Sequence, residues 1–337
     1  MPRRQFAHKA DEGKTTRAIS GRGKQGGEPI ESLAGSKQAA RSPPRETARG
    51  AAETPSFAPG LYLVATPIGH LRDVSLRALD LLAAADLVAC EDTRVTEKLM
   101  ARYGLKAPRL AYHEHNAERM RPLLIERLKA GAVVALVSDA GTPLVSDPGF
   151  KLVRAAVAEG IAVTALPGPS AALAALVLSG LPSDRFLFQG FLPPKAAARR
   201  RVLGEIAGLS ATLVFFETAP RLAAALADMA AVLGDRPAAV ARELTKLYEE
   251  IRRGSLAELA AHYTEAGAPK GELAIVVGGA SAEALRAAVT SDALDAALDA
   301  ALATMSVKDA SAAVAAATGR PRREVYQRAL ILAGRGE

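Results

Sequence analysis

The residues best suited to chemistry lie in short segments where Gly, Pro and polar residues directly follow an apolar run. The longest such segment is SDAGTPLVSDPG at 138–149, which follows the apolar residues 132–137. Its Gly and Pro residues fix turns, and its polar atoms come from Asp139, Thr142, Ser146 and Asp147. A loop of this kind offers backbone N–H and C=O groups to a small molecule. The segment is therefore typical of a ligand-binding loop, with two consecutive turns as the alternative.

Two other segments repeat this arrangement. LYLVATPIGH at 61–70 runs from apolar residues into a Pro-Ile-Gly turn, and AVTALPGPSA at 162–171 leads into Ser170. Ser is a preferred N-cap, and an Ala/Leu-rich helical pattern follows it. Because ligands of parallel sheets bind beyond the carboxyl ends of the strands, we expect the three loops to converge on one crevice.

These loops require a sheet to position them. Between residues 61 and 166 we expect strands alternating with helices: strands near 61–65, 87–90, 133–137 and 162–166, and helices near 71–84, 93–102, 116–130 and 148–159. This alternation predicts a parallel sheet covered by helices. After a linking helix at 170–180, a second unit is expected from segments 186–193, 212–217, 238–245 and 272–279, with a helix at 220–233.

The C-terminal segment has a pattern of its own. Ser306 is expected to cap a helix at 307–317, a turn follows at 318–321, and a second helix runs over 322–332. Basic residues outnumber acidic ones here; they are Lys308, Arg320, Arg322, Arg323 and Arg328. The pattern is similar to a nucleic-acid-binding helix-turn-helix, and the alternative is a small packing or dimerisation piece.

Composition and charge limit the class of protein. The chain has 337 residues, 49% of them hydrophobic, and no apolar run of membrane-spanning length, so we expect a soluble protein of two domains with appendages. Of the formal net charge of +7, residues 1–57 contribute eleven Lys and Arg against six Asp and Glu. This segment lacks hydrophobic periodicity and is predicted to be a disordered basic tail, with an electrostatic arm for RNA as one interpretation. No apolar stretch follows Arg3 and Arg4, so a cytoplasmic location is expected.

Cysteine and histidine usage argues against metal chemistry. Cys90 is the only cysteine, so it has no internal disulfide partner and is expected to be buried. His113 and His115 form the one close histidine pair, but residues two apart do not share a helix face. We therefore expect no metal site.

Eight segments occur in the order found in the tetrapyrrole methylase superfamily, and the chain resembles the members that methylate ribosomal RNA over roughly residues 60–335. The segments are LYLVATPIG, ACEDTR, SDAGTPLVSDPG, PGPSA, DRFLFQGFLP, FFETAPRL, RELTKLYEE and KGELAIVVGG. The resemblance implies an α/β fold with a parallel-sheet N-terminal domain and a mixed-sheet C-terminal domain. It further implies S-adenosylmethionine held between the two domains, and methyl transfer to the 2′-hydroxyl of a cytidine in the decoding region of 16S ribosomal RNA.

The domain boundaries expected from this resemblance and the patterns above follow in chain order. They are a tail at 1–57, an N-terminal methylase domain at 58–169, a linking helix and hinge at 170–184, a C-terminal methylase domain at 185–280 and a helical basic extension at 281–337. Superfamily members are commonly dimers, so a homodimer is expected. Two other functions stay open: methylation of a small corrin precursor, and RNA binding or assembly without catalysis.

The resemblance also implies site residues. The expected cofactor-binding residues are Pro67, Ile68, Gly69, Gly141, Thr142, Val145, Ser170, Ala171 and Ala241. The family usually has Asn after the Pro-Ile-Gly turn, where this chain has His70.

The catalytic residues follow from the chemistry of the donor. A sulfonium methyl group is already activated, so alignment matters most and a general base adds to it. The catalytic candidates at apparent strand ends are Glu91, Asp92 and Lys246, although residues 91–94 could equally form a helix N-terminus. Candidate RNA phosphate contacts are Arg94, Arg221, Arg242, Arg320, Arg322 and Arg323, with solvated or paired cations as the alternative.

Overall fold

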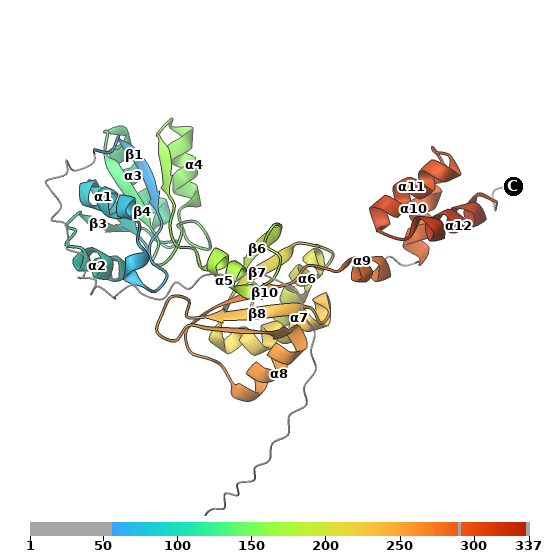
Figure 1. Ribbon diagram of the computed structural model, residues 1–337. Coiled ribbons are helices and arrows are strands. Elements are labelled where there is room, and N and C mark those ends of the chain that lie inside the picture. Colours follow the sequence, from blue (N-terminus) through green and yellow to red (C-terminus); the bar gives the residue numbers. More distant parts are fainter. Residues whose placement is uncertain (1–55, 289–290, 335–337) are drawn as a thin grey trace, which may run out of the picture. The chain divides into compact units, whose positions relative to one another are not determined.

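The computed structural model describes residues 56–288 and 291–334 (Figure 1). The predicted basic tail therefore lies almost wholly outside the described residues. Within the described residues, none of the helices has the length and apolar character needed to cross a membrane.

The N-terminal sheet has five parallel strands in the order β3-β2-β4-β1-β5. The strands are β1 (Gly60–Val64), β2 (Leu87–Cys90), β3 (Arg109–Ala111), β4 (Val133–Val137) and β5 (Val163–Leu166). Every residue of β2 and β4 is buried, as expected for strands covered on both faces. The parallel sheet is confirmed, and Cys90 is buried as expected. Strand β3 was not predicted, because it is short and only partly buried.

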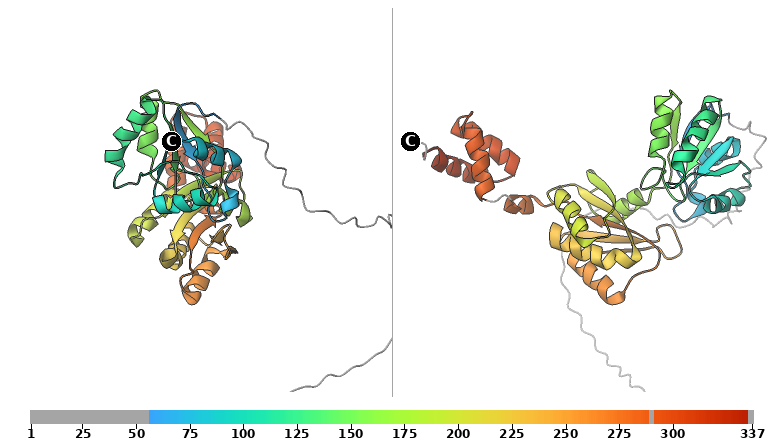
Figure 2. Two further views of the ribbon diagram at one scale, coloured as in Figure 1. Left: turned by 90° about the vertical axis from the view of Figure 1, so that its left-hand side faces the viewer. Right: turned by 180° about the vertical axis from the view of Figure 1, so that it is seen from behind.

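Helices cover both faces of this sheet (Figures 1 and 2). The helices are α1 (Leu76–Ala84), α2 (Thr93–Arg102), α3 (Ala117–Lys129) and α4 (Phe150–Ala158). One core contains Leu82 of α1 and Met100 of α2, and the core on the other face contains Leu124 of α3 and Leu152 of α4. The single helix predicted at 71–84 is wrong. A 3-10 turn, η1 (Leu71–Asp73), is separated from α1 by extended residues, and Ser75 caps α1 through a bond from the N–H of Ala78.

The C-terminal sheet is mixed, with strand order β6-β7-β10-β8-β9. The strands are β6 (Phe186–Phe191), β7 (Thr212–Thr218), β8 (Pro237–Arg242), β9 (Glu250–Ser255) and β10 (Glu272–Val277). Only the β6–β7 pair is parallel among these described strands. The strand predicted at 238–245 is too long, since the chain leaves the sheet after Arg242 and Glu243 and Thr245 take positive φ values of 49° and 63°.

Two helical layers enclose this second sheet. Helices α6 (Ala196–Ile206), α7 (Leu222–Leu233) and α8 (Leu256–Ala266) pack on one face, and α5 (Ala171–Ser179) packs on the other. A short turn, η2 (Ala219–Arg221), precedes α7. The linking helix is confirmed as α5, capped by Ser170 and ended by left-handed Gly180. Helices α6 and α8 and strand β9 were not predicted, because their segments mix charged and apolar residues without a clear period.

The C-terminal helices are α9 (Ala282–Ala288), α10 (Ser291–Leu302), α11 (Val307–Thr318) and α12 (Arg322–Ala333). Ser306 caps α11 as predicted, with its hydroxyl accepting a hydrogen bond from the N–H of Asp309 at 3.2 Å. Helix α10 was not predicted as a partner, yet its Leu298 is fully buried among residues of α11 and α12. The helix pair is thus part of a three-helix unit with its own core.

Candidate active site

The three predicted loops meet at the carboxyl edge of the N-terminal sheet. Thr66 and Gly141 exchange two backbone hydrogen bonds, at 2.9 and 3.0 Å, which tie the loop after β1 to the loop after β4. The hydroxyl of Thr142 donates to the carbonyl of Pro169 at 3.2 Å, which joins the loop after β5. The expected convergence of the three loops is therefore confirmed.

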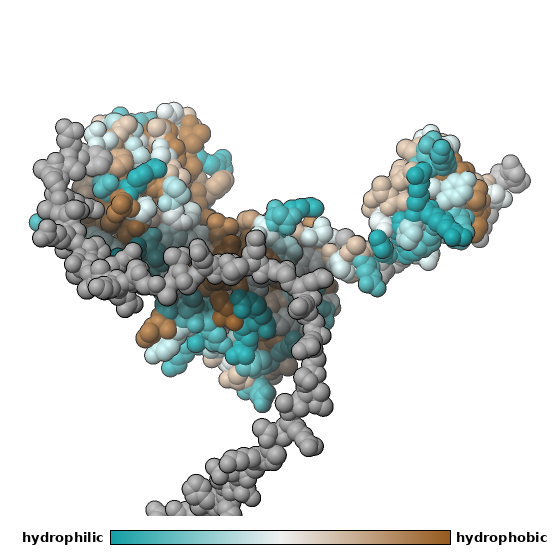
Figure 3. All heavy atoms as spheres, in the orientation of Figure 1, coloured by the Kyte–Doolittle hydropathy of each residue, from teal (hydrophilic) through white to brown (hydrophobic). Residues whose placement is uncertain are grey.

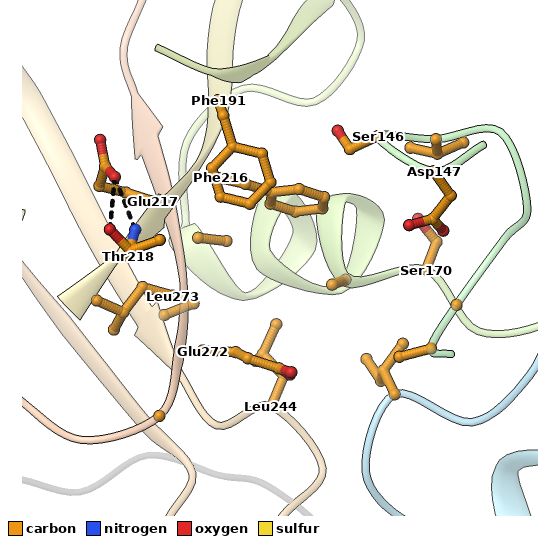
Figure 4. A pocket seen from close by; sticks show the side chains of 18 of the residues that line it. Ser146, Asp147, Ser170, Phe191, Phe216, Glu217, Thr218, Leu244, Glu272 and Leu273 are labelled. Atoms are coloured by element: carbon orange, nitrogen blue, oxygen red, sulfur yellow. Dashed lines mark hydrogen bonds between the residues drawn. The ribbon is translucent and has the colours of Figure 1, made fainter. Parts of the chain in front are cut away.

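A cavity of about 430 Å³ opens between these loops and the C-terminal sheet (Figure 4). Seven of the nine expected cofactor-binding residues line it: Ile68, Gly141, Thr142, Val145, Ser170, Ala171 and Ala241. Gly141 has φ of 80°, and a Cβ placed there would lie 3.4 Å from Ile68 Cγ2, so this position favours glycine.

Aromatic side chains form the wall of the cavity contributed by the C-terminal sheet. Phe191 and Phe216 line it with ring centroids 5.7 Å apart, and Phe188 packs edge-on against Phe216 at 4.9 Å. Sequence reasoning missed these phenylalanines. Period-2 alternation would place Phe188 and Phe191 on opposite faces of β6, and they reach the same wall because of a bulge between Phe188 and Gly190 that the sequence pattern does not reveal.

A second hollow of about 400 Å³ adjoins the first and shares Ile68, Ala140 and Glu272 with it. Its other lining residues include the two remaining expected cofactor residues, Pro67 and Gly69, together with Thr96, Lys98, Asp139 and Lys246. The two hollows therefore form neighbouring compartments on either side of the Pro-Ile-Gly turn.

The Pro-Ile-Gly turn contacts the loop between β8 and β9 directly. The N–H of His70 donates to the Thr245 hydroxyl at 3.0 Å. A Cβ on Gly69 would lie 2.5 Å from Lys246 Cγ and 2.9 Å from the carbonyl oxygen of Leu244. Glycine is thus required here by close approach, which the sequence alone did not reveal. His70 Nδ1 accepts the N–H of Arg72 at 3.3 Å, so the imidazole acts as a helix cap, as an Asn side chain would.

The first cavity is acidic. Its described lining residues include Asp147, Glu217 and Glu272 but no Lys, Arg or His. Glu217 is paired with Arg221 at 3.2 Å, and Glu272 with Lys246 at 2.9 Å. Burial, together with the negative charges of Glu91 and Asp139, raises the pKa of Asp147 to about 6, and the Ser138 hydroxyl offsets part of this rise. A cavity with this charge favours a cationic ligand.

The predicted catalytic carboxylates do not lie in either hollow. Asp92 is the N-cap of α2: it accepts the N–H of Arg94 at 2.8 Å and pairs with the Arg94 guanidinium at 2.6 Å. Hydrogen bonds from the Arg94 side chain and backbone hold the pKa of Asp92 at about 2, which makes it a weak base. The segment 91–94 therefore leads into the N-terminus of α2, which was the alternative interpretation of these residues. Burial raises the pKa of Glu91, with Asp139 adding to the rise.

Lys246 and Asp139 do reach the second hollow. Lys246 Nζ donates to Glu243 Oε1 at 2.8 Å and to Glu272 Oε2 at 2.9 Å. Burial alone would lower the pKa of Lys246, but these two carboxylates raise it above its ordinary value, so this amine stays protonated. Asp139 Oδ1 accepts the N–H of Asp92 at 3.0 Å, and burial is the main cause that raises its pKa.

The expected RNA-contacting arginines divide into two groups. Four are paired with carboxylates: Arg94 with Asp92, Arg221 with Glu217, Arg242 with Glu250 and Arg320 with Glu324. Arg322 and Arg323 are exposed at the start of α12, and neither forms an ion pair with a described residue. Arg328 is held by Asp295 of α10. Of the six expected residues, Arg322 and Arg323 at the N-terminus of α12 are therefore the two that can bind an RNA phosphate without first breaking an ion pair with a described carboxylate.

Comparison with known proteins defines the class. Residues 60–260 match the family "Tetrapyrrole (Corrin/Porphyrin) Methylases", and residues 288–333 match the "RsmI C-terminal HTH domain". The chain belongs to the tetrapyrrole methylase family and is an S-adenosylmethionine-dependent methyltransferase.

Its relatives are more specific. The chain is 51% identical over 275 residues to Ribosomal RNA small subunit methyltransferase I of Mesorhizobium japonicum, an alignment covering 81% of this chain and 92% of that protein. It is 46% identical to the protein of the same name from Pseudomonas aeruginosa, over 82% of this chain and 98% of the relative. A crystal structure of diphthine synthase shares the fold, with a TM-score of 0.50 and 21% identity over 65% of this chain and 89% of that one.

The first cavity fits the donor that this class requires. S-adenosylmethionine carries a positive sulfonium, which suits the unpaired Asp147 carboxylate and the aromatic wall of Phe191 and Phe216. The apolar residues at its base, Ala241 and Leu244, offer a dry surface for the adenine ring.

Proposed function

We propose that this methyltransferase modifies the 2′-hydroxyl of a cytidine ribose in the decoding region of 16S ribosomal RNA, within the small ribosomal subunit and in the cytoplasm. The observation that carries the proposal is the match over residues 288–333 to the C-terminal domain of the rRNA enzymes. The methylase fold alone is shared with diphthine synthase, whereas this second match extends the similarity beyond that fold.

The donor is assigned to the first cavity and the ribose to the second hollow. When bound, S-adenosylmethionine supplies an activated methyl group to an oxygen nucleophile. Gly141 and Thr142 present backbone to it, Ser170 and Ala171 begin α5 beside it, and Ala241 faces it from β8. Ile68, Ala140 and Glu272 lie between the two compartments, because these three residues line both, whereas Pro67 and Gly69 line the second hollow alone.

The acceptor hydroxyl is assigned to the hollow that contains Asp139 and Lys246. Asp139 is the general base in this proposal, since it lines the second hollow and burial raises its pKa above the ordinary value, which makes this carboxylate a stronger base. Lys246 is a poor base but a good partner for a phosphate or a ribose oxygen. The nearby Glu91 acts indirectly, because its negative charge raises the pKa of Asp147, while the charge of Asp139 raises the pKa of Glu91 itself.

RNA binding is assigned first to α11 and α12. The exposed Arg322 and Arg323 stand at the N-terminus of α12, where backbone N–H groups also favour phosphate. The paired cations Arg94, Arg221, Arg242 and Arg320 contribute less in this proposal, because a phosphate must compete with an existing carboxylate.

A homodimer is part of the proposal. Helix α5 exposes Leu173 (50%) and Val177 (71%), and hydrophobic side chains gather around this helix in Figure 3. An apolar surface of this kind is commonly covered by a partner. Sedimentation at micromolar concentration should show a dimer that Val177→Glu converts to monomer. A wild-type chain that stays monomeric would exclude the dimer.

Methyl transfer to small-subunit particles from a strain lacking this activity tests the function. Tritium from labelled S-adenosylmethionine should appear on one cytidine ribose, resistant to alkaline cleavage at that nucleotide. Naked 16S RNA serves as the parallel substrate, and the Gly141→Val enzyme as the control for donor dependence. Label on a base, or no label on particles or RNA, would reject the proposal.

A further inference from the structure

Asp147 occupies a special position in the first cavity. Figure 4 shows its carboxylate on the side of the cavity opposite Phe191 and Phe216. Asp147 belongs to the loop after β4. Three carboxylates line this cavity among the described residues, and Glu217 and Glu272 are each paired with a cation, whereas Asp147 has no Lys or Arg partner.

The loop holds this carboxylate in place through its backbone. Leu144 and Ser146 have φ values of 73° and 68°, which are unfavourable for residues other than glycine. Such conformations persist only where the surroundings enforce them. Ser146 is held close to the bulge in β6, since a Cβ on Gly190 would lie 3.3 Å from its hydroxyl oxygen. Asp147 is therefore fixed at the cavity and not on a free surface loop.

The charges that face Asp147 are all negative. Glu91 at the end of β2 and Asp139 after β4 act on it from the N-terminal sheet, and Ser138 supplies a hydroxyl. Glu217 and Glu272 line the opposite side, each neutralised by its own cation. A ligand with positive charge relieves this excess of negative charge, and a neutral ligand does not.

We propose that Asp147 makes the cavity discriminate between S-adenosylmethionine and its demethylated product by charge. The donor carries one net positive charge because of its sulfonium, whereas S-adenosylhomocysteine is a neutral zwitterion that differs by one methyl group. Loss of the methyl group therefore removes the attraction to Asp147 and favours release of the product. The inference concerns the donor alone and does not depend on which acceptor is methylated.

The proposal predicts a pH dependence with a definite sign. The carboxyl of Asp147 titrates near pH 6 in the free protein. Binding of a cation favours the ionised form and lowers this pKa, so donor binding should release protons near pH 6. Donor affinity should be greatest above pH 6 and fall as the pH drops from 7 to 5, while the affinity for the neutral product stays level or rises slightly.

Titration calorimetry of the full chain with S-adenosylmethionine and S-adenosylhomocysteine, without RNA, tests this inference. At pH 7, Asp147→Asn should reduce the donor-to-product affinity ratio by roughly tenfold, the effect of one charge interaction in a partly solvated cavity. Glu265→Gln is the matched control, since it removes one exposed carboxylate of α8 that lines neither hollow. Its affinity ratio should stay within about twofold of wild type.

Measurements on the wild-type chain provide an independent check if Asp147→Asn fails to fold. Calorimetry at pH 6 in two buffers of different ionisation enthalpy counts the protons released. The donor should release protons and the product should not. The proposal would be overturned if Asp147→Asn reduced the affinity for both ligands equally, or if the affinities of the wild-type chain for both ligands had the same pH profile. Donor binding with the expected ratio but no methylated RNA would instead reject only the proposed function.

Discussion

Replacement of Gly69 by Ala tests whether the Pro-Ile-Gly turn must pack against the β8–β9 loop. The added methyl would lie 2.5 Å from Lys246 Cγ, 2.7 Å from the Thr245 hydroxyl and 2.9 Å from the Leu244 carbonyl oxygen. Lys246 is flexible, but the carbonyl oxygen belongs to backbone and yields less easily. Overpacking of this kind costs roughly 1–3 kcal/mol.

The same substitution should alter activity more than donor binding. To admit the methyl, the loop must move away and lose the 3.0 Å bond from the His70 N–H to Thr245. This movement displaces Lys246 from the second hollow. In the first cavity it affects Ile68, Leu244 and Glu272, the ion-pair partner of Lys246, and leaves most of the other lining residues in place. We expect the turnover rate to fall about 10–100-fold, as misplacement by an ångström can cause, with donor affinity changing less than threefold on the same order-of-magnitude scale.

The assay combines thermal unfolding, calorimetry with the donor and single-turnover methyl transfer. Gly204→Ala is the matched control, because a Cβ at this position in α6 meets no atom within 4 Å. Ala is favoured over Gly in a helix by up to about 1 kcal/mol, so the control should be as stable as wild type or more so. A Gly69→Ala enzyme with wild-type stability and turnover would refute the reasoning about this contact.

Four further predictions concern separate parts of the chain. Gly141→Val places a β-branched residue at φ of 80° and next to Ile68, so calorimetry should detect no donor binding in a chain whose circular dichroism is native; wild-type affinity would remove this loop from the site. Arg322→Gln with Arg323→Gln should weaken RNA binding and reduce its salt dependence by roughly one phosphate contact per arginine, with donor affinity unchanged; an unchanged salt slope would favour a packing role for α12. Asp139→Asn should lower single-turnover rates by roughly 10²–10⁴-fold, whereas Asp92→Asn should leave them near wild type; equal effects would contradict the assigned base. Hydrogen bonds from Arg94 lower the pKa of Asp92 to about 2, so its contribution to the free energy of unfolding should be present above pH 4 and lost as the pH falls toward 2. Acid unfolding of the wild type and of Asp92→Asn would measure this difference.

The sequence predicted the parts of the fold that depend on local patterns. Continuous apolar runs gave β2 and β4 at their observed residues, because strands buried on both faces need apolar side chains at every position. Ser75 was overlooked as a helix cap, so the chain from 71 to 84 was interpreted as one helix. Strand β9 has two arginines and a glutamate, and its identity depends on pairing with β8, which no local pattern reveals. Helix α8 was missed although its start carries a local signal, the capping box formed by Ser255 and Glu258.

The candidate site likewise has parts that local sequence patterns predict and parts that depend on the folded structure. The Gly- and Pro-rich loops carried enough information to predict where they converge, since strand direction fixes one edge of a parallel sheet. Of the three catalytic candidates, Lys246 lines the second hollow, but Glu91 and Asp92 line neither hollow, because position after a strand does not determine side-chain direction. Asp92 follows β2 directly, yet its carboxylate turns back to cap α2. Asp147 lies ten residues beyond β4, and only the folded loop brings it to the cavity.

The pairing of Glu243 with Gly271 has a consequence for how relatives of this chain can vary. The Glu243 carboxylate fills the space that a Cβ at position 271 would need, and its Oε1 accepts both Lys246 Nζ at 2.8 Å and the N–H of Glu272 at 3.0 Å. Any side chain at 271 must therefore displace Glu243 and break its bond to Lys246, which leaves Lys246 with Glu272 as its remaining carboxylate partner among the described residues. Positions 243, 246 and 271 should covary as one unit during evolution, and a chain that loses the glycine at 271 should also lose the glutamate at 243.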